Sequence, residues 1–422
     1  MVKIMPTKQL TVYRTLMDGR KIRVGELAEN KQGIFFAYDE NYLSNYPNLS
    51  PFKLEKTTAL QLAPVSPHDG LHGVFADSLP DGWGLLLQDR FFEANQLNLY
   101  RISPLDRLAF VGDTGIGALS FEPVNHQSQY EEETNLFELG RNAQQIFEGQ
   151  TDEVLQTLLQ AGSSGGARPK AQIFISEANP QICRTQSLPE DDAWIVKFTT
   201  KSLPLKHEEG LLEAVYLSMA QKAGLKPVKW QLLEQGQFYW IAVKRFDYVS
   251  GSLGRVHTHT LCGLLDASYR MPSIDYFGLI KATKVLCQSR VASQLQFCRA
   301  MFNLFSLNQD DHSKNWSFVQ DEQGEWQPSL AYDITYSPLR HGQHSTGFRQ
   351  YGKAPPLNII QELAEVAGFN YWNEAKIAIQ EVVESIADFS EIAKTFPITQ
   401  QTVTKIQRHL DLAWQENKLL CS

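Results

Sequence analysis

Residues 308–315 read Asn-Gln-Asp-Asp-His-Ser-Lys-Asn, and this stretch decides the fold class. Asp310 and Asn315 stand five positions apart in a short polar loop, so both side chains can point into one cleft. Downstream, Asp333 follows a short apolar run that ends at Tyr332. Carboxylate and amide oxygens are hard ligands that suit magnesium, which keeps water and phosphate as its other ligands. These residues therefore predict a site for metal-assisted phosphoryl transfer.

The spacing of Asp310 and Asn315 is that of the catalytic loop of protein kinases. There the aspartate orients the attacking hydroxyl and accepts its proton, and the asparagine holds magnesium against the phosphates. The spacing alone is weakly specific, because Asn, Asp and Ser also gather in ordinary turns. Asp311 is a second candidate for the base, and we choose Asp310 for its spacing to Asn315.

Upstream of this loop, Lys197 lies among bulky apolar residues in a predicted strand at 194–199. A lysine in that setting needs an anionic partner, and a nucleotide phosphate would serve. Alternatively, Lys197 lies on an edge strand and its ammonium group reaches water. Glu213, in a predicted helix at 208–223, is either the partner that pairs with Lys197 as in kinases or a solvated residue.

The most glycine-dense segment reads Gly-Ser-Ser-Gly-Gly at 162–166, and Lys170 follows it. The backbone N–H groups of Gly165 and Gly166, with the lysine nearby, could bind phosphates. The segment matches neither the Walker pattern nor G-x-G-x-x-G, and a flexible linker is the alternative.

Length, charge and cysteine content exclude several classes of protein. At roughly 150 residues per domain, 422 residues predict two or three domains, and 43% hydrophobic residues exclude a mostly disordered chain. The 39 basic and 47 acidic residues give a net charge of −8, which argues against nucleic-acid binding by charge alone. Five scattered cysteines argue against a disulfide framework, and His257, His259 and Cys262 lack an evident fourth metal ligand. No run approaches the roughly 18 apolar residues of a membrane span, so we expect a cytoplasmic protein without a membrane partner.

Periodicity and turn residues predict the elements. The polar run 125–134 places a domain boundary near residue 130, and Thr151 is a candidate N-cap for a helix at 151–160. Beyond residue 276 the chain reads as mostly helical. The other predicted elements are strands at 9–15, 21–27, 33–38, 171–176, 238–246, 316–319 and 326–331, and a helix at 81–95.

These motifs together resemble the HipA family of serine/threonine kinase toxins from bacterial type II toxin–antitoxin systems. The resemblance spans nearly the whole chain. It implies an α+β, bilobal protein-kinase-like fold: an N-terminal β-containing subdomain (1–130), then a kinase core (131–422) with a small lobe (about 140–250) and a largely helical lobe (about 251–422). The matching segments are 24–27, 36–39, 75–82 (Phe-Ala-Asp-Ser-Leu-Pro-Asp-Gly), 165–171, 195–198, 244–247, 310–315 and 332–333.

The resemblance also implies a role for each site residue. Asp310 is the catalytic aspartate, and Asn315 and Asp333 bind Mg²⁺. The implied ATP-binding residues are Lys197, Gly165, Gly166 and Lys170 at the phosphates and Arg245 and Phe246 at the adenine pocket.

A serine of the glycine-containing loop is autophosphorylated in the family. Ser163 is the matching position, with Ser164 the near alternative, and an added phosphate there would repel the nucleotide. Lys244 and Gly263 stand where some members carry glutamate and glutamine near the nucleotide, so the adenine contacts stay open.

The function implied by the resemblance is an ATP- and Mg²⁺-dependent serine/threonine protein kinase, the toxin of a toxin–antitoxin system. The implied partners are a small HipB-like helix-turn-helix antitoxin, operator DNA reached mainly through that antitoxin, and a protein substrate, which in some members is an aminoacyl-tRNA synthetase. Two alternatives stay open: a small-molecule or lipid phosphotransferase, and a non-catalytic co-repressor that acts with an antitoxin.

Overall fold

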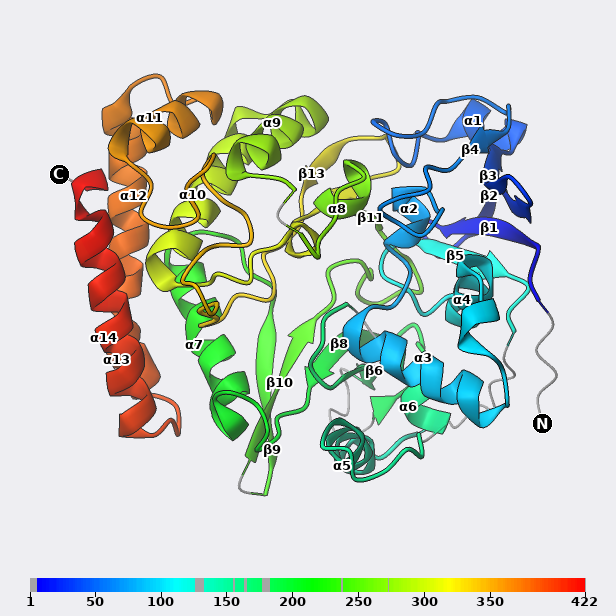
Figure 1. The fold of residues 1–422 in the computed structure, drawn as a ribbon, viewed down its shortest axis with the longest axis horizontal. Helices are drawn as coiled ribbons and strands as arrows, with labels where there is room; N and C mark the ends of the chain where they lie inside the picture. Colours follow the sequence, from blue (N-terminus) through cyan, green and yellow to red (C-terminus); the bar gives the residue numbers. More distant parts are fainter. Residues whose placement is uncertain are drawn as a thin grey trace.

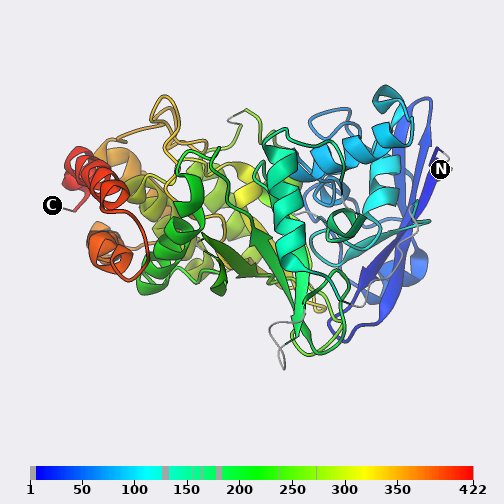
Figure 2. The ribbon, with the colours of Figure 1, turned by 90° about the horizontal axis from the view of Figure 1, so that it is seen from below.

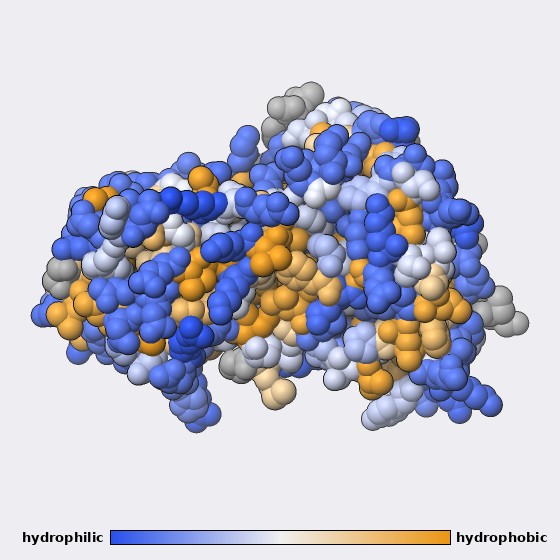
Figure 3. All heavy atoms as spheres, turned by 90° about the horizontal axis from the view of Figure 1, so that it is seen from above, coloured by the Kyte–Doolittle hydropathy of each residue, from blue (hydrophilic) through white to orange (hydrophobic). Residues whose placement is uncertain are grey.

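The computed structural model describes residues 6–125, 133–154, 156–162, 165–176, 183–236, 238–271 and 273–421. The chain runs from one end of an elongated molecule to the other, with the N-terminal sheet at one end and the last helices at the opposite end (Figure 1). The upper face is largely hydrophilic, and hydrophobic side chains gather in a hollow near its middle (Figure 3).

Residues 6–125, which we call the N-terminal half although they are less than a third of the chain, are built on a five-stranded antiparallel sheet of order β4-β3-β2-β1-β5. Side chains alternate between its faces, which is why Leu10 and Val12 of β1 are both fully buried. The strands are β1 (Gln9–Thr15), β2 (Lys21–Asn30), β3 (Gly33–Tyr38), β4 (Gln61–Leu62) and β5 (Leu119–Glu122). The helices are α1 (Glu40–Asn45), α2 (Gly73–Ala76), α3 (Gly82–Ala94) and α4 (Pro104–Val111).

A second five-stranded antiparallel sheet, of order β7-β6-β8-β10-β9, forms the small lobe. Trp83 and Leu87 of α3 belong to the core of this lobe, so one N-terminal helix packs on it directly. Helix α5 lies on the underside of the molecule, next to the sheet (Figure 2). The elements are α5 (Leu136–Phe147), α6 (Gln156–Gln160), β6 (Lys170–Ser176), β7 (Cys183–Arg184), β8 (Asp191–Lys197), α7 (Glu209–Lys222), β9 (Trp230–Gln235) and β10 (Phe238–Lys244).

The C-terminal lobe is mostly helical, and it carries a small sheet of order β11-β12-β13. Helix α10 lies at its centre and contacts α9, α12 and α14. The strands are β11 (His257–Thr260), β12 (Ser317–Gln320) and β13 (Trp326–Pro328). The helices are α8 (Leu261–Leu264), α9 (Tyr276–Cys287), α10 (Arg290–Ser306), α11 (Leu357–Val366), α12 (Trp372–Ala387), α13 (Phe389–Ala393) and α14 (Gln400–Asn417).

Most predicted elements are confirmed to within a few residues, but the helix predicted at 151–160 is wrong over its first half. Residues 151–154 are not helical, and the described helix spans Gln156–Gln160. The Thr151 hydroxyl accepts the backbone N–H of Glu153, two residues on, so it closes a local turn instead of capping a helix. The domain boundary predicted near residue 130 lies outside the described residues. None of the described helices is both long and apolar enough to span a bilayer.

Candidate functional site

A cleft of about 960 Å³, including its opening to solvent, lies where the small lobe, the helical lobe and the N-terminal half meet. All three regions contribute residues to the wall of this cleft, so the cleft forms only when the whole chain is folded. We call residues 245–247, which follow β10, the hinge. The small lobe and hinge supply Gly165, Gly166, Ile195, Lys197, Val228, Val243, Lys244, Arg245, Phe246 and Asp247; the helical lobe supplies Thr258, Thr260, His312, Lys314, Asn315, Ser317, Tyr332 and Asp333; and the N-terminal half supplies Asp77, Leu79, Asp81 and Ile116.

Lys197 is the cation at the centre of the site. It is the last residue of β8, and its Nζ lies 2.6 Å from Glu213 Oε1 and forms a second ion pair with Asp333. Burial would lower the pKa of Lys197, but the two carboxylates raise it above its ordinary value. Burial would raise the pKa of Asp333, but Lys197 and Lys170 hold it well below its usual range. Lys197 and Asp333 are therefore both charged at neutral pH.

Residues 165–169, the described part of the glycine-containing loop, lie beside this centre. Lys170 pairs with Lys197 across β6 and β8, and its Nζ donates to the carbonyl oxygen of Gly165 at 2.5 Å. Gly166 has a φ of +101°, a backbone conformation that residues with a Cβ rarely adopt, so the position favours glycine. The loop serines Ser163 and Ser164 lie outside the described residues.

The predicted catalytic loop places its two aspartates in opposite environments. The Asp310 side chain is 59% exposed, with His312 Nε2 3.9 Å from its Oδ1. The buried Asp311 carboxylate accepts hydrogen bonds from the Tyr276 hydroxyl, from His344 Nδ1 at 2.8 Å and from the backbone N–H of Thr346 at 3.0 Å. Asp311 is thus committed to structure, and the Asp310 carboxylate is the one open to solvent.

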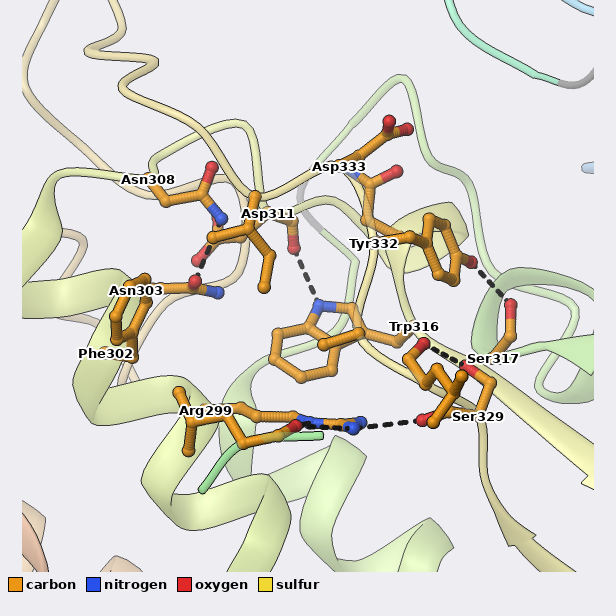
Figure 4. A pocket seen from close by; sticks show the side chains of 15 residues that line it. Arg299, Phe302, Asn303, Asn308, Asp311, Trp316, Ser317, Ser329, Tyr332 and Asp333 are labelled. Atoms are coloured by element: carbon orange, nitrogen blue, oxygen red, sulfur yellow. Dashed lines mark hydrogen bonds between the residues drawn. The ribbon is translucent and has the colours of Figure 1, made fainter. Parts of the chain in front are cut away.

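A small cavity lies beneath this loop and is enclosed by structural contacts. The Trp316 indole N–H donates to the Asp311 carbonyl oxygen at 2.9 Å, and Arg299 donates to the Ser329 carbonyl oxygen at 3.0 Å (Figure 4). Asp333 also lines this cavity, but its carboxylate points away from Trp316 (Figure 4). The contacts around this cavity therefore support the loop, while Asn315 and Asp333 line the larger cleft as well.

Asn315 is oriented by the same loop. It ends a 3₁₀ turn (Ser313–Asn315), and its Nδ2 donates to the backbone carbonyl of Asp310 at 2.7 Å. Because the amide nitrogen is used in this way, the side-chain oxygen of Asn315 remains as a ligand for a cation. Asp333, at a φ of +51°, lines the same cleft. The two residues supply the hard oxygen donors that fit Mg²⁺.

The hinge residues Arg245 and Phe246 make different kinds of contact. The buried Arg245 guanidinium pairs with Asp247, and it donates to Gln172 and to the carbonyl oxygen of Gly115 at 3.0 Å. These contacts tie the hinge to the N-terminal half, and Arg245 also lines the cleft. The ring of Phe246 lies in the cleft wall and packs on Tyr332, with ring centroids 5.7 Å apart.

The pattern of His257, His259 and Cys262 is not a metal site. His257 Nε2 lies 2.9 Å from the carbonyl oxygen of Leu49, and His259 Nδ1 lies 2.6 Å from Asp77 Oδ2. Within the described residues, no cluster of three or more His, Cys, Asp or Glu side chains could hold a metal ion. His257 and His259 instead hold the N-terminal half against the helical lobe, and the Cys262 thiol donates locally to the carbonyl oxygen of Ala267.

Sequence reasoning missed the contribution of residues 75–82 to the site. Asp77 accepts the backbone N–H and the hydroxyl of Thr260, at 2.7 and 2.6 Å. Asp81 accepts from Lys314 Nζ at 2.6 Å and from the backbone N–H of Gly166. Two aspartates in one loop motif were the available signal, but nothing in the spacing shows what they contact.

Comparisons with known proteins agree with this architecture. The HipA N-terminal domain family matches residues 16–122, and the HipA-like C-terminal domain family matches residues 162–392. The fold is similar to the Shewanella oneidensis MR-1 HipA structure, solved with HipB and its operator DNA, at a TM-score of 0.70 and 17% identity over 96% of this chain and 95% of that chain. A Helicobacter pylori proinflammatory kinase, CtkA, matches at a TM-score of 0.42 and 13% identity over 62% of this chain and 92% of that chain.

No curated protein matches the sequence. The C-terminal family match alone covers more than half of the 422 residues, and the N-terminal match covers most of the first sheet. The chain therefore belongs to the HipA family and has its α+β, kinase-like fold.

Proposed function

We propose that this protein is an ATP- and Mg²⁺-dependent serine/threonine protein kinase and the toxin of a toxin–antitoxin pair. The observation that carries the proposal is the pairing of Lys197 with Glu213 and Asp333, beside a cleft that Lys197, Asp333 and Asn315 line together. A buried lysine held between two carboxylates is what a nucleotide site needs to receive phosphate charge. Family membership supports the same reading.

Each residue has a role that its position supports. Lys197 and the loop glycines Gly165 and Gly166 would face the phosphates, while Asn315 and Asp333 would hold Mg²⁺. Bound Mg²⁺ would neutralise charge on the transferring phosphoryl group. Asp333 can reach a cation once a phosphate competes for Lys197. The exposed Asp310 would orient the acceptor hydroxyl and take its proton.

The remaining expectations are proposals that rest on the family. Autophosphorylation would occur at Ser163, or at Ser164, and would place negative charge beside the phosphate site. The Shewanella relative was solved with HipB and operator DNA, and we infer a helix-turn-helix antitoxin as the partner here too. A net charge of −8 indicates that operator contact would run mainly through that antitoxin.

The test is transfer of labelled γ-phosphate from Mg-ATP by the full chain and by the Asp310→Asn variant. We expect the variant to lose about a thousandfold in rate, since a positioned base typically supplies 10²–10⁴-fold. Its melting temperature should stay unchanged because the side chain is exposed. The matched control is Asp152→Asn, which changes an aspartate side chain that is 98% exposed.

The outcomes separate the three functions. Transfer by Asp310→Asn at the wild-type rate would overturn the assignment of the base. Label found on a metabolite or lipid and never on protein would favour a small-molecule or lipid phosphotransferase. Failure of the wild type to bind Mg-ATP in calorimetry would favour the non-catalytic co-repressor.

A further inference from the structure

The side chain of Asp81 stands at the start of α3 but does not serve that helix. Asp81 is the N-cap residue, a position where aspartate ordinarily accepts a backbone N–H of its own first turn. Here it makes no side-chain capping bond. Its two carboxylate oxygens are instead directed out of the N-terminal half, each towards a different loop.

The two loops are the ones on which the proposed chemistry depends. Oδ1 accepts the backbone N–H of Gly166 in the glycine-containing loop, and Oδ2 accepts from Lys314 Nζ at 2.6 Å. Lys314 directly precedes the proposed magnesium ligand Asn315. The partners of Asp81 are 85 and 233 positions away in the sequence, so this one carboxylate joins three distant segments.

Backbone contacts show that the glycine-containing loop is seated on the start of α3. The backbone N–H of Trp83 donates to the carbonyl oxygen of Gly166 at 2.9 Å, and the Trp83 indole N–H donates to the carbonyl oxygen of Lys170 at 2.8 Å. A Cβ at Gly82, which has a φ of +44°, would lie 2.6 Å from that Gly166 oxygen. The close approach therefore requires glycine on the α3 side.

The ion pair between Asp81 and Lys314 is largely buried, so each charge depends on the other for compensation. Their side chains are only 8% and 17% exposed, and the Lys314 ammonium also lies 4.4 Å from the centre of the Tyr269 ring. Burial would lower the pKa of Lys314, but Asp81 raises it above its ordinary value. Burial would raise the pKa of Asp81, but Lys314 and the Gly166 N–H lower it. Either charge without the other would be buried without compensation.

We propose that Asp81 is a positioning residue through which the N-terminal half holds the glycine-containing loop over the nucleotide cleft and fixes Lys314, and with it Asn315, on the opposite wall. The N-terminal half is then part of the kinase machinery and not only a platform beside it. The catalytic consequence rests on the proposed function, whereas the seating of the loop does not.

The first experiment measures amide hydrogen exchange by mass spectrometry on the full chain without nucleotide. Asp81→Ala removes both acceptors, and we expect exchange in peptides covering 165–171 to rise about tenfold or more, because hydrogen bonds to charged groups are among the stronger ones. Asp81→Asn keeps an acceptor for the Gly166 N–H and should give a smaller rise. The matched control is Asp89→Asn, which removes the carboxylate charge from the 2.7 Å pair between Asp89 of α3 and Arg107 of α4 and leaves the cleft untouched.

The second experiment measures kcat and the KM for ATP of the same variants. Asp81→Ala should raise KM and lower kcat, and Asp81→Asn should fall between it and the wild type, because Asn keeps the loop contact but loses the charge. Asp89→Asn should match the wild type in both constants. A purely structural role would lower melting temperature and active fraction without changing KM.

The outcomes distinguish this inference from the proposed function. Unchanged exchange at 165–171 in a folded Asp81→Ala protein would overturn the seating of the loop, and unchanged KM and kcat would overturn the positioning role. If Asp81→Ala fails to fold, the same two readouts on Asp81→Asn decide. A wild type without any phosphoryl transfer would defeat the proposed function, while the exchange result would still decide whether Asp81 holds the loop.

Discussion

Replacement of Lys197 by methionine should destabilise the fold by about 4 kcal/mol at pH 7 and by only about 1 kcal/mol at pH 5. Methionine keeps most of the aliphatic volume but leaves Glu213, whose side chain is 4% exposed, without its cation. Asp333 is 34% exposed and can turn towards water, so the loss of its partner adds little to the destabilisation. The loss of stability in Lys197→Met therefore comes mainly from the buried Glu213 carboxylate, which has lost its cation.

The size of this destabilisation is limited because the Glu213 carboxylate can take up a proton. An uncompensated buried charge costs about 3–5 kcal/mol, unless the group takes up a proton instead. A glutamic acid ordinarily titrates near pH 4.3, so protonation costs about 4 kcal/mol at pH 7 and about 1 kcal/mol at pH 5. This proton uptake sets the upper limit at each pH. The penalty is therefore largest at neutral pH and fades as the pH falls towards 4.

The assay is urea unfolding followed by tryptophan fluorescence at pH 7 and pH 5. The matched control is Lys244→Met, because Lys244 also lines the cleft but pairs with the more exposed Asp192 at 2.6 Å. That control should lose about 1 kcal/mol or less at either pH. A loss for Lys197→Met that is the same at both pH values, or no larger than the control, would refute the reasoning. The double variant Lys197→Met/Glu213→Leu should recover most of the loss at pH 7.

Two further predictions concern stability alone. Asp311→Ala should cost about 3 kcal/mol or more, because the Tyr276 and His344 donors lose a buried acceptor, and chemical denaturation should show this loss. A loss under about 1 kcal/mol would mean that Asp311 does not support the loop. Burial lowers the pKa of His72 to about 4 from 6.5, so its contribution is complete above pH 6.5 and is lost as the pH falls towards 4. Between pH 7.5 and 5 the wild type should therefore lose about 2 kcal/mol more than His72→Gln, and parallel pH profiles would contradict this.

Local pattern predicted much of the fold. The strands at 9–15 and 33–38 match the structure to the residue, because their alternation and the glycine turns beside them are local properties. The helix predicted at 81–95 is confirmed with its two end residues as caps. The error at 151–160 came from a threonine whose hydroxyl had two local partners to choose from, a helix N–H or a turn N–H.

The sequence by itself determined the residue types of the site and their order, since the spacing of Asp310 and Asn315 and the lysine at 197 are properties of short segments. Only the tertiary structure decided which aspartate is exposed, that Arg245 is a tether, and that Asp81 reaches across to Lys314. The physical reason is distance along the chain. Spacing rules act within one helix or loop, whereas charge pairing between segments depends on where packing of the whole core brings them.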